Sequence, residues 1–241
     1  MKSKYITQCD ELYSKLKMLG FKRKGHDYFK DNGTIRCELG FSHSVHHESH
    51  VKYYTITVLI EYLDVREIAQ KIDVNIGGFG INIGHLSENN YFKEWKVPND
   101  STDIYVSEVI SDMYQYILNY AMPYFKRYSD IKNVIADMEL NKLANQIDTY
   151  HYLPIMYFIS GESKKACIYL ENRLNQLKIK AIPKAFSDES FVNSIYGIED
   201  STDTIEKRTY LLYKDFVCKL TELIRKSFEE HAPQHVLKNL E

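Results

Sequence analysis

Histidine is the residue type in this chain whose spacing is most suggestive of chemistry. His46, His47 and His50 follow closely on one another where a predicted strand enters a loop. Imidazole nitrogen is a common zinc ligand, so these three residues are candidate metal ligands. With His43 the order is H-x-x-H-H, which lacks the H-E-x-x-H arrangement, in which a glutamate base lies between two ligands one helical turn apart. The alternative, which the sequence favours, is a solvated loop that requires no cofactor.

A second pair of histidines, His43 and His85, is a candidate for a ligand pocket. Each stands at the end of a segment in which apolar and polar residues alternate, so both imidazoles are expected on the buried face near the edge of a sheet. Two imidazoles in that position can line a pocket or act as an acid and a base. The alternative is a pair of histidines that only hydrogen-bond within the fold.

Other patterns that could carry chemistry are weaker. Gly77 to Gly80 together with Gly84 do not have the G-x-G-x-x-G spacing, and no P-loop lysine follows them. Glycines in a predicted strand more often mark a close approach of backbone. The basic run Lys22 to Lys24, followed by Tyr28 and Phe29, mixes charge and aromatic rings as single-strand binders do. A run of three charges is more often the solvated edge of a sheet.

The four cysteines are scattered along the chain, so no zinc or redox pair is indicated. We find no nucleophile motif and no paired carboxylate motif either, so whether the chain is an enzyme stays open.

The composition is that of a globular protein, with 44% hydrophobic and 27% charged residues in 241. The net charge of −2, from 31 basic and 33 acidic residues, disfavours a nucleic-acid partner. No apolar run is long enough to span a bilayer and the first residues lack a secretory pattern, so we expect a cytoplasmic protein without a membrane role. Tyrosine is abundant, with 20 copies, and is suited to recognition surfaces, although a genome rich in A and T is the favoured explanation of the excess because Lys, Ile and Asn are also frequent. The oligomeric state is not indicated.

The first part of the chain is predicted to form strands and two helices. Helical spacing covers residues 3–19 and 65–72, and strands are expected at 21–29, 35–45, 53–63 and 79–85. Asp31-Asn32-Gly33 predicts a hairpin turn, because Asn and Gly tolerate the positive φ of such turns. The strand at 53–63 is apolar on both faces and is therefore expected near the centre of the sheet.

The remainder of the chain is predicted to be helical. Helices are expected at 104–120, 130–145, 152–160, 164–177 and 204–230, with a mostly irregular connection at 177–204. Ser129 or Asp130 is expected to cap the second of these helices. Residues 150–177 resemble one helix–turn–helix repeat of the tetratricopeptide type, but a single unit is weak evidence for a solenoid, and a simple helical hairpin packed on the sheet is the favoured interpretation. The prediction is an α+β fold in which an antiparallel sheet of three to five strands is flanked by helices. Residues 1–98 form the sheet region, and residues 99–241 form a helical region packed on it as one continuous unit.

Three short segments carry a family resemblance. Leu16 to Asp31 has a helix end, then Gly-Phe-Lys-x-Lys-Gly, then an aromatic pair; Phe79 to Gly84 and Ala121 to Phe125 are further matches. These segments resemble the bacterial family called domain of unknown function 4304. The resemblance implies a bacterial α+β protein. It implies no established activity and no catalytic residues, and the histidine-rich loop departs from the family pattern.

Two functions follow from these observations as alternatives. The first is a non-enzymatic binding or protein-interaction module whose partner is another protein. The second is a metal-dependent or acid–base enzyme that uses the histidines at the sheet edge.

Overall fold

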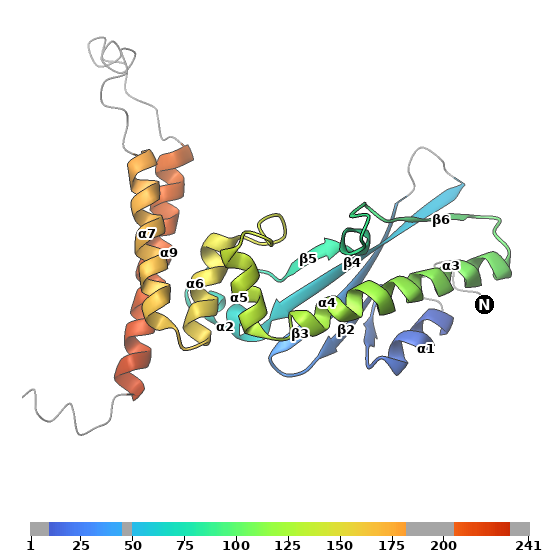
Figure 1. The fold of residues 1–241 in the computed structure, drawn as a ribbon, viewed down its shortest axis with the longest axis horizontal. Coiled ribbons are helices and arrows are strands. Elements are labelled where there is room, and N and C mark those ends of the chain that lie inside the picture. The colour runs from blue at the N-terminus through green and yellow to red at the C-terminus, as the bar shows by residue number, and fades with distance from the viewer. Residues whose placement is uncertain (1–9, 45–49, 182–204, 232–241) are drawn as a thin grey trace, which may run out of the picture. The chain divides into compact units, whose positions relative to one another are not determined.

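A computed structural model describes residues 10–44, 50–181 and 205–231 of the chain (Figure 1). Two compact units are present. Unit 1 consists of Met1–Glu67 and Ile76–Thr149, and unit 2 consists of Ile68–Asn75 and Tyr150–Glu241. The division of the chain at residue 98 into a sheet region and a helical region stays a prediction. Among the described helices, none combines the length and apolar character needed to cross a bilayer.

Unit 1 contains a six-stranded antiparallel sheet in the order β1-β2-β3-β4-β5, with β6 also paired to β4. The strands are β1 (Lys22–Lys24), β2 (Asp27–Asp31), β3 (Ile35–Ser44), β4 (Val51–Tyr62), β5 (Phe79–Asn82) and β6 (Trp95–Pro98). The predicted α+β class is confirmed. The sheet has more strands than expected because Gly25, at φ +65°, turns one predicted strand into the β1–β2 hairpin, and because β6 was not predicted.

The register of β3 and β4 explains the alternation seen in the sequence. Leu39 lies opposite Val58 and Phe41 lies opposite Ile56, and all four side chains are buried on the same face of the sheet. Three helices cover this face: α1 (Asp10–Met18), α3 (Asp103–Tyr116) and α4 (Met122–Arg127). As predicted, β4 is the central strand, since it pairs with β3, β5 and β6.

The long helix of unit 1 continues through Pro123 rather than ending before it, as the sequence had predicted. A π-helical turn, η3 (Ile117–Ala121), joins α3 to α4, and the Met122 N–H donates to the Ile117 carbonyl. The wider π turn changes which carbonyl each N–H reaches just before the proline, so the missing N–H and the ring of Pro123 are tolerated in the first turn of α4.

The other helices of unit 1 follow their local signals. α2 (Leu63–Lys71) begins in unit 1, and η2 (Ile83–Leu86) is a short 3-10 turn after β5. α5 (Ile131–Glu139) is capped as predicted, because the Asp130 carboxylate accepts from the Lys132 N–H at 2.9 Å.

Unit 2 is helical and contains α6 (Thr149–Ile159), α7 (Ser163–Ala181) and α9 (Ile205–His231). The predicted helical hairpin is present, since Gly161 at φ +83° separates α6 from α7. α7 and α9 pack against each other along their lengths (Figure 1). Most of the predicted irregular connection, residues 182–204, lies outside the described residues.

Candidate functional site

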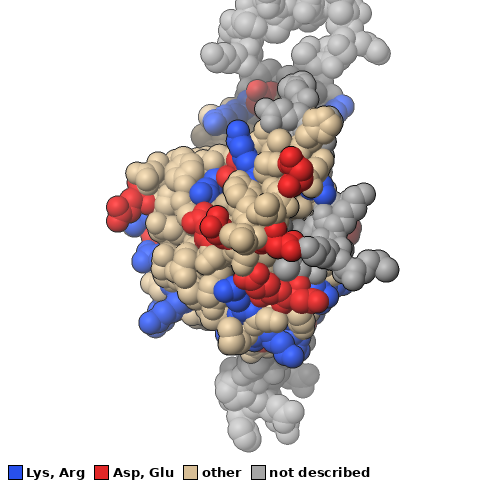
Figure 2. Space-filling model, turned by 90° about the vertical axis from the view of Figure 1, so that its right-hand side faces the viewer, with Lys and Arg blue, Asp and Glu red and all other residues tan. Residues whose placement is uncertain are grey.

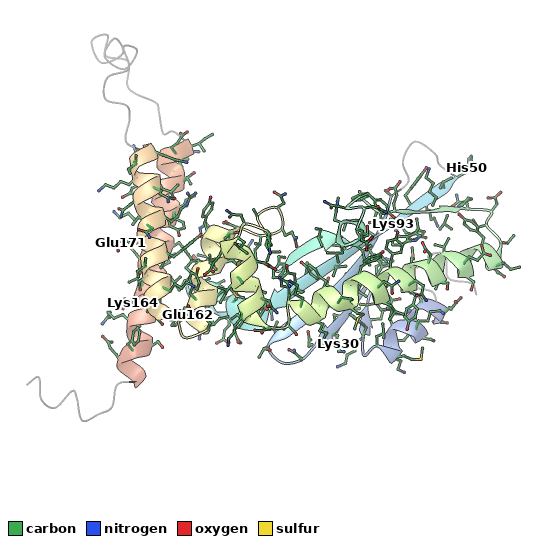
Figure 3. All side chains as sticks on the ribbon, in the orientation of Figure 1. Lys30, His50, Lys93, Glu162, Lys164 and Glu171 are labelled. Atoms are coloured by element: carbon green, nitrogen blue, oxygen red, sulfur yellow. The ribbon has the colours of Figure 1, made fainter. Side chains whose placement is uncertain are left out.

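The described candidate histidines each have different neighbours in the structure. His43 is exposed near the end of β3, opposite Tyr54, with the two ring centroids 5.8 Å apart. His50 is exposed in the turn before β4, at the end where that strand begins (Figure 3). Its backbone carbonyl accepts from the Asn99 N–H at 2.8 Å. His46 and His47 lie outside the described residues. Within the described ranges no group of three potential ligands is placed to hold a metal, and the zinc prediction stays a prediction.

His85 does not continue a strand, which corrects the sequence interpretation. β5 ends at Asn82, whose side-chain oxygen accepts from the Gly84 N–H at 3.0 Å and starts the 3-10 turn η2. This local cap replaces the extended backbone that the alternation had indicated. His85 Nδ1 lies 3.0 Å from Asn90 Oδ1, and its ring contacts Phe92. The use of His43 and His85 as a joint pocket therefore stays a prediction, as does the enzyme alternative that depends on it.

A different group of side chains comes together where the loop between η2 and β6 meets the helix α3. We call it the aromatic patch; Tyr91, Lys93, Trp95, Asp112 and Tyr116 are linked by mutual contacts, and the neighbouring Phe92, whose ring contacts His85, is included with them. The residues come from two stretches of chain about twenty positions apart. Figure 3 shows Lys93 in this loop, on the side of the sheet where β6 runs.

The Asn82 side chain fixes the backbone of the loop at Lys93. Its side-chain NH₂ donates to the Lys93 carbonyl at 3.1 Å, and its side-chain oxygen accepts from the Lys93 N–H at 2.9 Å. This paired contact satisfies both backbone groups of Lys93, much as a neighbouring strand would. The loop is therefore held by the end of β5.

Gly84 allows the loop to lie close to η2. A Cβ atom at this position would be 2.3 Å from the Tyr91 carbonyl oxygen and 2.5 Å from the Lys93 Cβ. These distances are shorter than van der Waals contact, and the Tyr91 carbonyl is a backbone group that can avoid the Cβ only if the loop moves. A side chain at residue 84 would therefore displace the loop. Close backbone approach, one of the sequence interpretations of these glycines, is found at Gly84 and at Gly78, where a Cβ would be 2.5 Å from the Ile60 carbonyl oxygen, but not at Gly77, where a Cβ would meet no atom within 4 Å.

Lys93 places its ammonium group in a cage built from two rings and a carboxylate. Nζ lies 5.0 Å from the ring centroid of Trp95, 4.6 Å from that of Tyr116 and 3.4 Å from Asp112 Oδ2. The Trp95 indole N–H donates to the same Asp112 oxygen at 2.7 Å, which orients both groups. We call Trp95, Tyr116 and Asp112 the cation cage. Ring faces and a carboxylate all attract a positive charge.

The rim of the patch is open to solvent. Tyr91 is 38% exposed and Phe92 is 59% exposed. The Tyr91 and Tyr116 hydroxyl oxygens lie 2.6 Å apart, so the rim is tied to the cage. This hydrogen bond, with added burial, raises the pKa of Tyr116, so its phenol stays neutral at physiological pH.

Sequence reasoning missed this patch, although two signals were present. Tyr91-Phe92-Lys93-Glu94-Trp95 is a short run that alternates rings and charges, and Tyr116 and Tyr120 are one helical turn apart. Neither signal says that the run folds back onto α3, because that contact is made by the tertiary structure.

Residues 12–127 match the model of Domain of unknown function (DUF4304). The match confirms the resemblance inferred from the sequence. The matched segment spans all six strands, α3 and α4, and therefore contains every residue of the aromatic patch. No curated protein and no solved structure shows significant similarity to the chain.

Proposed function

We propose that the chain is a binding module that contacts another protein through the aromatic patch of its DUF4304 segment. One observation carries the proposal: Tyr91 and Phe92 are exposed on a loop whose backbone is fixed by Asn82 and by the close approach at Gly84. Rings held in place before a partner arrives lose little conformational freedom on binding. Tyrosine and tryptophan are also enriched among the residues that dominate interface energies.

The chemistry of the patch supports recognition by contact. The rings supply large apolar areas, while the Tyr91 hydroxyl and the Asp112 carboxylate supply hydrogen-bonding groups at their edges. An exposed apolar area with polar groups around it is the usual composition of a protein-binding surface.

The proposal is tested by selecting peptides from a random displayed library on the full chain and measuring their affinity by calorimetry. Replacement of Phe92 by Ala is expected to weaken binding by about tenfold or more, because a buried anchor ring contributes roughly 2 kcal/mol at an interface. Tyr91→Ala should act in the same direction with a smaller effect.

Phe228→Ala is the matched control. Phe228 is also a highly exposed phenylalanine, at 62%, but it lies on α9 in unit 2. We expect this variant to bind selected peptides as the unaltered chain does. Peptides that bind Phe92→Ala normally but fail to bind Phe228→Ala would show that the recognition surface is elsewhere.

A further inference from the structure

The cation cage has the arrangement that proteins use to bind an ammonium group, and its present occupant is the chain's own Lys93. The Lys93 side chain is only 19% exposed, while Asp112 beside it is 50% exposed. The site is therefore formed and filled, yet one wall is accessible from solvent. Recognition of ammonium ligands between ring faces beside a carboxylate is a well-established use of this geometry.

We propose that the cage is a binding site for a cationic side chain of a basic partner segment, which enters by displacing Lys93. The inference rests on the proposed function and specifies the partner's chemistry. In the free protein the Lys93 ammonium group occupies the cage. A partner must therefore supply a cationic side chain that replaces it.

Displacement requires only a side-chain movement. The Lys93 backbone N–H and carbonyl are both bonded to Asn82, so the loop keeps its position when the side chain leaves. The Lys93 stem has four rotatable bonds, and Asp112 is the one carboxylate within salt-bridge distance of its ammonium group among the residues that the structure describes. The released ammonium group regains its hydration in water, and an incoming cation makes the same ring and carboxylate contacts.

The charge of the surrounding chain favours a basic partner. Residues 83–116, which carry the patch and all of α3, include six acidic and two basic residues and so have a net charge of −4, more negative than the −2 of the entire chain. Figure 2 shows acidic side chains on this end of unit 1, with lysine and arginine side chains interspersed among them. Such a surface attracts lysine- and arginine-rich segments and repels acidic ones.

The chain contains a single tryptophan, Trp95, so intrinsic fluorescence reports directly on the cage. The test titrates choline into Lys93→Ala at constant ionic strength. Removal of the internal occupant is expected to give a saturable fluorescence change, with an affinity about tenfold or more above that of the unaltered chain. The neutral carbon isostere of choline should give no saturable change, because ring faces attract the charge rather than the shape.

Two further variants separate the cage from a general effect of charge. Asp112→Asn in the Lys93→Ala background should weaken choline binding several-fold. Lys126→Ala removes an exposed lysine of α4 outside the cage, and its affinity for choline should equal that of the unaltered chain. If Lys93→Ala does not fold by circular dichroism, Lys93→Ser provides the same vacancy with a residue that favours loops.

The proposal is overturned if choline gives no saturable change in a folded Lys93 variant, or if the neutral isostere binds equally well. Peptides selected on the full chain should be rich in lysine or arginine; selection of acidic or uncharged peptides would contradict the basic partner. The choline result does not depend on Tyr91 and Phe92 as peptide anchors, so failure of the cage and failure of the proposed function are distinguishable.

Discussion

Unit 1 contains two carboxylates that receive similar partners in different surroundings. Asp112 accepts from the Trp95 indole and faces the Lys93 ammonium, and it is 50% exposed. Asp137 accepts from the Tyr128 hydroxyl at 2.9 Å, and its side chain is only 4% exposed.

Two cationic side chains form salt bridges with the Asp137 carboxylate. Arg127 Nη2 lies 2.6 Å from Oδ2, and Lys142 Nζ lies 3.2 Å from Oδ1. Both oxygens of the buried carboxylate are thus paired. The buried Asp137 carboxylate, with both oxygens paired, holds its partners in fixed positions. The Asp112 carboxylate makes similar contacts but is open to solvent on one side, so its cationic partner can exchange.

Tyr128 extends the Asp137 clamp into the sheet. Its backbone carbonyl accepts from the Tyr62 hydroxyl at 2.5 Å, and its ring packs on Phe79 of β5. Asp137 therefore fixes the residue that joins the end of α4 to β4 and β5, whereas Asp112 fixes a surface loop. We expect the two carboxylates to differ most in their effect on stability.

The largest effect is predicted for Asp137→Ala. Loss of this carboxylate leaves the buried Tyr128 hydroxyl without its acceptor and removes the partner of two cations, so the free energy of unfolding of unit 1 should fall by about 2–4 kcal/mol. Urea unfolding followed by Trp95 fluorescence measures this change. Asp112→Ala is the matched comparison and should cost about 1 kcal/mol or less, because water can replace an exposed carboxylate. Equal losses in the two variants would refute the distinction.

Gly84→Ala is expected to have the next largest effect, because the new Cβ would collide with the backbone of the loop. We predict a loss of about 1–3 kcal/mol in stability and weaker binding of the selected peptides. Gly77→Ala is the control, since a Cβ there meets no atom within 4 Å. If Gly84→Ala binds peptides as tightly as Gly77→Ala does, a fixed loop is not what recognition requires.

The smallest effect is predicted in the response to acid. Burial by itself would raise the pKa of Asp137, but hydrogen bonds from Arg127, Tyr128 and Lys142 outweigh it and hold the pKa below its ordinary value. The stabilisation is therefore present above the unfolded pKa of about 4 and is lost as the pH falls through the lower pKa of the folded state.

Thermal unfolding at neutral pH and near pH 3 measures this acid response. The stability difference between the unaltered chain and Asp137→Asn should narrow on acidification. A difference that stays constant or widens would show that the charge of Asp137 does not contribute.

Local sequence patterns predicted many of the elements of unit 1. The alternation in β3, the Asn32-Gly33 turn and the Asp130 cap all act over a few residues, and each is where the sequence placed it. The Asn32 side-chain oxygen accepts from the Ile35 N–H at 2.8 Å, which closes the turn without help from the rest of the fold.

The errors occur where a distant contact decided the local structure. Trp95 to Pro98 is too short to indicate a strand and ends in a proline, and it becomes β6 because β4 offers it an unpaired edge. Pro123 lies within a helix because η3 adjusts the preceding turn while Phe125 packs against Phe21. His85 leaves the strand pattern because Asn82 caps a turn.

The sequence by itself determined the α+β class, the buried face of the central hairpin, the helical hairpin of unit 2 and the resemblance to DUF4304. These depend on periodicity, turn residues and short motifs, which act between near neighbours in the chain. Only the tertiary structure decided that Lys93 lies between Trp95 and Tyr116, and that Asp112 is open while Asp137 is buried. Such differences arise from packing between residues distant in sequence, and residue type alone does not specify the solvent exposure of a charged group.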